Sequence, residues 1–230
     1  MDHLSIEKHI ASQFNDDLEG IRTRLFEMGG RVEEQLKNAL KAIRDADSEI
    51  AATVIKNEEL IDDMEIRIDE DCLLIIARRQ PAASDLRLII SVGRAVTDLE
   101  RVGDEAKKIA QLAVELTEQG PAPRGYSEVR HIGKSVQQML HNSLDAFARY
   151  DVDAALETLR EDDQIDRDYE SAIRELMTFM MEDPRSIRRV MNIMWAIRSL
   201  ERIGDHARNL CEHVVFVVKG KDIRHGNDEV

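Results

Sequence analysis

The sequence predicts an all-α protein built as two tandem three-helix bundles related by internal duplication. Apolar residues recur at intervals of three and four along most of the chain, which is the period of an amphipathic helix. No segment alternates apolar and polar residues for long enough to form a strand. An eight-residue motif, Leu99–Ala106, returns 101 positions later as Leu200–Ala207 and is identical at six of its eight positions. Self-similarity at a fixed offset indicates a duplicated architecture.

The first two helices follow from apolar stripes and capping residues. A stripe over 18–43 predicts the first helix, which Gly29-Gly30 is expected to weaken or bend. Asp47-Ser48 offers two good N-cap residues for the second helix. That helix must end before Pro81, because the residue preceding a proline is pushed out of the α region.

The third helix begins at a fresh cap, Ser84-Asp85, and its apolar stripe continues to position 116. It stops near Gly120-Pro121-Ala122-Pro123, a linker-like stretch. We therefore expect a first bundle over residues 1–118, a linker over 119–126 and a second bundle with a short tail over 127–230.

The second half repeats this plan. A stripe over 129–150 predicts a fourth helix, and Asp151 and Asp153 cap a fifth that ends at Asp183-Pro184. The sixth helix begins at position 187 and closes at Lys219-Gly220, a C-cap sequence. Long antiparallel helices joined by short loops are typical of helical bundles.

The composition limits the classes of function that this chain can have. The chain has 32 basic and 46 acidic residues, a net charge of −14, which argues against a nucleic-acid partner. Cys72 and Cys211 lie in apolar helical runs and are expected as free buried thiols, and the methionines over 177–194 as adaptable core packing. Since we find neither a secretory signal nor an apolar run that could span a bilayer, we expect a cytoplasmic protein without a transmembrane segment.

Each copy of the repeated motif holds two carboxylates four residues apart, Glu100 with Asp104 and Glu201 with Asp205. Residues at this spacing share one helix face, where like charges destabilise an isolated helix by a few tenths of a kcal/mol. The glycine inside each pair costs roughly 1 kcal/mol more relative to alanine. A sequence that accepts both costs twice requires an explanation.

Two explanations remain open. In the first, Arg101 and Arg202 neutralise the carboxylates, and each glycine lets another helix pack closely. In the second, carboxylates from two helices form an oxygen-rich site for a divalent or trivalent ion such as Mg²⁺, Mn²⁺, Ca²⁺ or iron, with Zn²⁺ as a further candidate. Further candidate ligands of lower rank are Asp62, Glu65, Asp69, Asp98, Asp166 and Glu170.

The enzyme alternative is a carboxylate-bridged, metal-dependent oxidase or a metal-storage bundle. Such sites use Glu-x-x-His on two helices. This chain offers one, from Glu128 to His131, and His206 has Glu105 as its counterpart in the first copy. Both histidines are therefore expected on the surface. We find no nucleophile with a base, phosphate loop or dinucleotide motif, so we expect a protein that is not an enzyme.

The repeated Leu-Glu-Arg-[Val/Ile]-Gly-Asp sequence resembles the PhoU family. The corner Arg79–Arg87, the segment Glu27–Gly30 and the ending Val218–Gly220 are similar to the same family, so that the resemblance covers essentially the whole chain. It implies two three-helix bundles and metal sites of the form Glu/Asp-x-x-x-Asp, with the two motif pairs as ligands. Because Ser199 stands where the first copy has Asp98, the two sites are expected to differ.

The resemblance also implies a function. Members of the family are cytoplasmic adaptors between the ATPase subunit of the phosphate-specific ABC importer and a sensor histidine kinase. They are recruited to the inner face of the membrane through these partners, repress the phosphate-starvation response when phosphate is plentiful, and commonly form homodimers. On this basis Asp85, Arg87 and Arg149 are candidate docking residues, although an ordinary solvated charge explains each of them equally well.

Overall fold

A computed structural model of the chain describes residues 3–120 and 126–224. Over these ranges it contains helices and no strand, which confirms the predicted all-α class. The elements are α1 (His3–Asp45), α2 (Ser48–Arg79), α3 (Ala83–Glu118), α4 (Tyr126–Arg149), α5 (Val152–Glu182), a short 3₁₀ turn η1 (Pro184–Ser186) and α6 (Ile187–Lys219). Most of the predicted linker, residues 121–125, lies outside the described residues.

Local chemistry fixes most helix ends where the sequence places them. The Asp47 carboxylate accepts hydrogen bonds from the backbone N–H groups of Glu49 and Ile50, both at 3.0 Å, and so caps α2. Asp151 caps α5 in the same way, and Gly220 ends α6 in the left-handed region at φ 67°. The start of α3 differs from expectation: Ala82 is its N-cap without a side-chain hydrogen bond, so the Ser84-Asp85 pair lies inside the helix.

Gly29 of α1 and Gly133 of α4 allow close packing between the two halves. α1 continues through Gly29-Gly30 without a break. A Cβ atom on Gly29 would lie 2.9 Å from the side chain of Leu144, and one on Gly133 would lie 2.7 Å from Leu40. These two pairs are related by the same shift of 104 positions, so α1 and α4 approach each other closely at two duplicated points.

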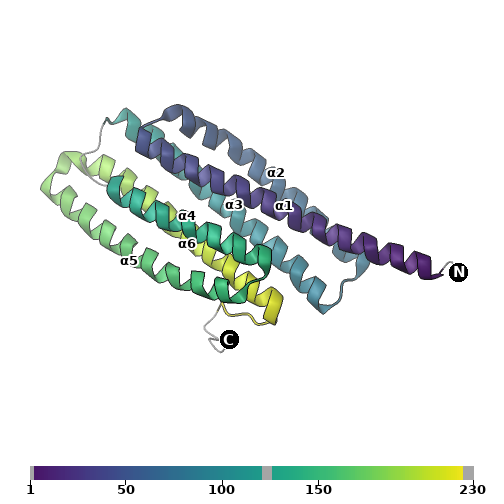
Figure 1. Cartoon of the computed structure of the whole chain (residues 1–230). Coiled ribbons are helices and arrows are strands. Elements are labelled where there is room, and N and C mark those ends of the chain that lie inside the picture. The colour runs from purple at the N-terminus through teal and green to yellow at the C-terminus, as the bar shows by residue number, and fades with distance from the viewer. Residues whose placement is uncertain (1–2, 121–125, 225–230) are drawn as a thin grey trace.

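The two bundles lie side by side (Figure 1). α1–α3 form one and α4–α6 the other, with α3 against α6 as the most extensive interhelix contact and α1 against α4 as a second one across the halves. α3 and α6 run antiparallel, and the α2–α3 and α5–α6 corners lie at opposite ends of the molecule (Figure 1). This arrangement places α2 and α5 on the outside.

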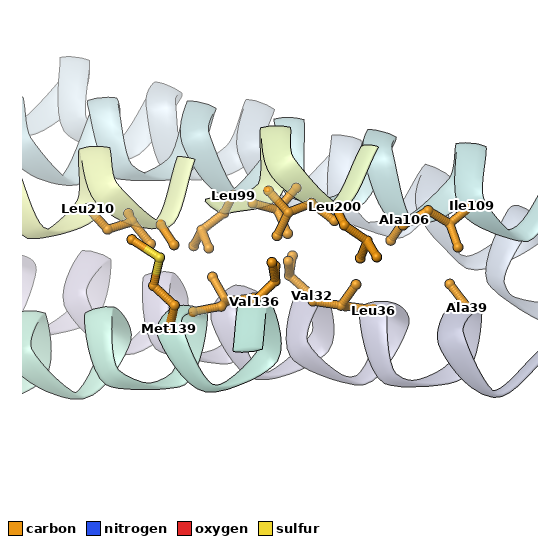
Figure 2. Packing of buried hydrophobic residues seen from close by; sticks show 14 of the residues in the cluster. Val32, Leu36, Ala39, Leu99, Ala106, Ile109, Val136, Met139, Leu200 and Leu210 are labelled. Carbon is orange, nitrogen blue, oxygen red and sulfur yellow. The ribbon is translucent and has the colours of Figure 1, made fainter. Parts of the chain in front are cut away.

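The buried apolar residues form one continuous cluster that spans both halves. Figure 2 shows Leu36 and Leu99 of the first half packed with Met139 and Leu200 of the second. These four side chains are fully buried, and such interiors pack as densely as organic crystals. The two bundles therefore share a core rather than acting as independent units.

Cys72 and Cys211 are free and buried, as predicted, and burial raises the pKa of each thiol to about 12. The methionine expectation is wrong in part, because Met177 and Met181 are 48% and 76% exposed at the α5–α6 corner. No helix in the described ranges is both long and apolar enough to cross a membrane.

Candidate metal centre

The first acidic cluster lies between α2 and α3. Glu100 and Asp104 face α2, where Glu58 and Asp62 stand one turn apart. Burial raises the pKa of the Glu100 carboxyl, and the nearby charges of Asp104, Glu65 and Asp62 raise it further. Ionised carboxylates gathered in this way favour a bound cation, because a nearby positive charge restores the ordinary ionisation of each group.

Glu58 is the most deeply placed member, with only 4% of its surface exposed. Burial raises the pKa of its carboxyl, and Asp62 and Asp104 add to the increase. Lys107 donates a hydrogen bond to Glu58 and opposes the shift. The Lys107 ammonium thus already supplies one positive charge to this cluster.

The second cluster repeats the arrangement between α5 and α6. Asp162 of α5 is 4% exposed, and burial raises the pKa of its carboxyl to about 6, with further contributions from Asp166 and Asp205. Burial and the charge of Asp205 also raise the pKa of Glu201. Arg208 occupies the place that Lys107 holds in the first cluster, with its Nη1 atom 3.4 Å from Asp162 Oδ2.

Sequence reasoning named the two motif pairs but missed Glu58 and Asp162. A signal was present: Glu58-Glu-Leu-Ile-Asp62 and Asp162-Asp-Gln-Ile-Asp166 are related by a shift of 104 positions. Each half therefore holds two carboxylate pairs with a spacing of four residues, one pair on each of two packed helices.

The two motif glycines differ in how closely the outer helix approaches them. A Cβ atom on Gly103 would lie 3.0 Å from Ile61, and one on Gly204 would lie 3.6 Å from Asp162 Oδ1. The close approach supports the packing role expected for Gly103. At Gly204 a Cβ atom would make only an ordinary van der Waals contact, so the packing there does not require a glycine.

Arginines neutralise the motif pairs only in part. Arg101 lies 3.3 Å from Glu100 Oε2 and 3.7 Å from Asp104 Oδ2. In the second half, Arg202 does not neutralise the motif pair, because it forms an ion pair with Glu105 of α3 at 3.1 Å. Arg198 instead lies 2.6 Å from Glu201 Oε1.

The second cluster leaves one acceptor unused. Glu201 Oε2 is buried and has no hydrogen-bond partner, a costly state for a carboxylate oxygen. A coordinated cation would satisfy this atom, so the donor set of the second cluster fits a hard metal ion. Within residues 3–120 and 126–224, no three His, Cys, Asp or Glu side chains are already gathered around a common point as metal ligands.

The lower-ranked metal-ligand candidates differ in whether they lie in an acidic cluster. Glu65 joins the first cluster electrostatically, with a pKa raised by burial and by Asp69 and Asp62. The pKa of Asp69 is raised by burial. Asp166 joins the second cluster. Glu170 is exposed and pairs with Arg174 at 3.4 Å, outside both clusters.

Asp98 lies outside the first cluster, and its role as a metal ligand stays a prediction that this geometry does not support. Its Oδ1 atom accepts hydrogen bonds from His206 and Asn209, both at 2.9 Å, and its Oδ2 atom lies 2.8 Å from His213. Burial opposes its charge, but the hydrogen bonds from His206, His213 and Asn209 together lower the pKa of Asp98 to about 2. Asp98 therefore joins α3 to α6.

The expectation that both histidines lie on the surface holds for His131 only. His131 is exposed and lies 3.1 Å from Asp168, whereas the side chain of His206 is 17% exposed and faces Asp98. Apart from a change of valine to isoleucine, the two motif copies differ at His206, where the first copy has Glu105, and just before the motif at Asp98, where the second has Ser199. Since Asp98 meets His206 and Glu105 meets Arg202, these differences follow from the contact between the halves.

The docking candidates have different surroundings. Asp85 is half-buried in the first turn of α3. Arg87 donates a hydrogen bond of 3.5 Å to the Val217 carbonyl and lies against Gly220, so it ties α3 to the end of α6. Arg149 is exposed and pairs with Asp145 on its own helix.

These features define a class of protein: a duplicated helical bundle with one outward carboxylate cluster per half. A comparison with known proteins agrees with this classification. The family model described as PhoU domain matches the chain twice, over residues 25–113 and 129–214. The chain belongs to the PhoU family.

Relatives and solved structures extend the match over nearly the whole chain. A phosphate-specific transport system accessory protein PhoU homolog from Pseudomonas aeruginosa is 57% identical, covering 96% of this chain and 91% of that protein. The protein named PhoU in Escherichia coli is 47% identical, over 100% of this chain and 95% of the relative. The crystal structure of PhoU from Pseudomonas aeruginosa superposes with a TM-score of 0.89, covering 90% of this chain and 100% of that one. PhoU from Streptococcus pneumoniae, 30% identical, gives a TM-score of 0.84 over 91% and 99% of the two chains.

Proposed function

We propose that this protein is a non-enzymatic, metal-binding regulator of phosphate uptake. In this role it couples the ATPase subunit of a phosphate-specific ABC importer to a sensor histidine kinase, and it represses the phosphate-starvation response when phosphate is plentiful. The observation that carries the proposal is the match over the full chain to relatives that are named accessory proteins of phosphate-specific transport.

The two carboxylate clusters support the metal-binding part. Oxygen donors from paired helices suit Mg²⁺, Mn²⁺ or iron, and they accept Zn²⁺ with lower preference. Without a cation, mutual repulsion keeps the carboxylates apart, and long side chains at the helix surface can rotate inward once an ion arrives. The raised pKa values of Glu100, Glu201 and Asp162 are the expected state of such a site before it binds metal.

In this proposal, the partners bind at the exposed ends of the helices. Arg149 presents an exposed charge at the end of α4. At the other proposed docking point, Asp85 lies in the first turn of α3 beside the Arg87 contact with α6, so a partner bound there would sense both halves. We place the protein in the cytoplasm as a homodimer that is recruited to the inner face of the membrane by its partners.

The test combines binding and regulation. Purified protein is used to capture the kinase and the importer ATPase, and a phosphate-responsive reporter is measured in a strain with Glu100→Ala and Asp104→Ala. We expect capture of both partners and derepression of the reporter at high phosphate.

Glu59→Ala with Asp63→Ala is the matched control, since it removes an exposed acidic pair of equal spacing on α2. The reporter should stay repressed in this control. Full repression in the Glu100/Asp104 strain would remove the metal centres from the mechanism, and failure to capture either partner would refute the adaptor role.

A further inference from the structure

A basic groove separates the end of α1 from the start of α4. Its volume is about 480 Å³, within the range of small-molecule sites. Leu40, Ile43 and Val129 line its base. The polar lining residues are Lys37, Lys41 and Arg44 from α1 and Tyr126, Ser127, Arg130, Lys134 and Gln137 from α4. Five of these are cationic and none is a carboxylate, in a chain whose net charge is −14.

The cations form two facing rows. Lys37, Lys41 and Arg44 share one face of α1 at spacings of four and three residues, which covers about 10 Å of helix at 1.5 Å per residue. Arg130 and Lys134 share one face of α4. The two helices are antiparallel and touch where Gly133 meets Leu40, so the rows run alongside one another. The positive charge is therefore extended along the groove.

Most of this charge is not neutralised within the chain. Arg44 is held by Asp45, with Nε–Oδ1 and Nη2–Oδ2 distances of 2.7 and 2.9 Å. Lys41 lies near Asp45 as well, one turn away. Within the described residues, Lys37, Lys41, Arg130 and Lys134 form no ion pair with a carboxylate. Four exposed cations around one groove repel each other and are stabilised by an anion.

The duplicated fold does not require this charge. A shift of 104 positions relates α1 to α4 and takes the groove to the opposite end of the same helix pair. There Lys37 and Lys41 are replaced by His141 and Asp145. The places of Arg130 and Lys134 are taken by Phe26 and Gly30. The basic groove thus belongs to one end only and is not a consequence of helix packing.

We propose that this groove binds a linear chain of phosphates, either an inorganic oligophosphate or the triphosphate of a nucleotide. Lysines bind phosphate as point charges, and Arg130 can form two parallel hydrogen bonds to one phosphate. The hydroxyl groups of Tyr126 and Ser127 supply further donors at one end. The α1 row of about 10 Å and the α4 row of about 6 Å can contact several linked phosphates at once, whereas a single orthophosphate is too short to reach all of these cations. The inference is independent of the metal centres.

The test is calorimetric titration of the full chain, freed of metal with a chelator and dialysed. The ligands are sodium tripolyphosphate, ATP, orthophosphate and vesicles containing anionic lipid. Lys41→Gln with Lys134→Gln removes one cation from each wall. Lys56→Gln with Arg160→Gln is the control, since it makes the same change of charge at exposed positions on α2 and α5, which do not line the groove.

We expect tripolyphosphate to bind, with an affinity that falls as salt is added. Removal of two charge-assisted contacts should weaken binding about 100-fold, tenfold for each, whereas the control stays within about twofold of the wild type. Comparison of tripolyphosphate with ATP distinguishes an inorganic chain from a nucleotide. Three results would overturn the proposal: equal affinity for orthophosphate, equal weakening in the control, or vesicle binding without binding of either oligophosphate.

Discussion

Asp162→Asn should stabilise the metal-free protein and weaken its binding of divalent cations. Asp162 is buried in the second acidic cluster, and its pKa is raised to about 6, so its ionisation at neutral pH opposes folding. Asparagine has almost the same shape but carries no charge. The substitution therefore removes the electrostatic cost and one carboxylate oxygen of the proposed metal site together.

The size of the stabilisation follows from the pKa shift of Asp162. Each pKa unit corresponds to about 1.4 kcal/mol, so an increase of about two units costs roughly 3 kcal/mol at pH 7. This shift already includes the opposing effect of the ion pair with Arg208. We therefore expect a gain of about 3 kcal/mol, which raises the Tm by about 6–12 °C for a chain of this length.

The dependence on pH gives a second readout. A raised folded-state pKa contributes stability that is complete below the unfolded-state pKa and is lost as pH rises through about 6. Metal-free wild-type protein should thus become more stable from pH 7 to pH 5, and Asp162→Asn should reduce this dependence. Urea unfolding at several pH values measures both effects.

Asp163→Asn, at the exposed neighbouring position, is the control and should change stability by less than about 0.5 kcal/mol. If Asp162→Asn destabilised the metal-free protein at pH 7, our interpretation of the cluster as a strained cation site would be wrong.

Three further predictions concern other parts of the molecule. Asp98→Ala should lower the free energy of unfolding, measured with urea at pH 7, by about 3 kcal/mol, because it leaves buried His213 without its partner. In the wild type, the stability contributed by Asp98 should be lost only as pH falls from about 4 towards 2. Mn²⁺ should raise the Tm in scanning calorimetry and a chelator should reverse the increase, while an unchanged Tm would count against both clusters. Cys72 and Cys211 should react slowly with iodoacetamide at pH 8 in the native protein and rapidly in urea, because burial raises their pKa to about 12; fast native modification, measured by mass spectrometry, would show that the core opens.

Local chemistry made the fold predictable. Asp47, Asp151 and Gly220 each satisfy orphan backbone groups at a helix end, and such residues can be recognised without knowledge of the tertiary structure. The start of α3 could not be placed as closely, because Ala82 caps the helix without any side-chain hydrogen bond. The apolar stripes supplied the number of helices, and the duplication supplied their division into two bundles.

The candidate site was predictable only within each helix. The motif pairs are visible because both members lie on one face of one helix. Glu58 and Asp162 were missed, since they belong to the site only through the packing of α2 on α3 and of α5 on α6. The contact of Asp98 could not be predicted for the same reason: its partner His206 lies 108 residues away, and the sequence does not specify which side of α6 faces α3.

The most direct test of the account is elemental analysis of the untagged protein after equilibration with Mn²⁺ and gel filtration. Four forms are compared: the wild type, Glu100→Gln with Asp104→Asn, Glu201→Gln with Asp205→Asn, and the quadruple variant. We predict that each double variant loses the ion of its own half and that the quadruple variant retains none. A wild type without bound manganese, or a quadruple variant that binds as much as the wild type, would contradict the claim that the duplicated carboxylates form metal sites.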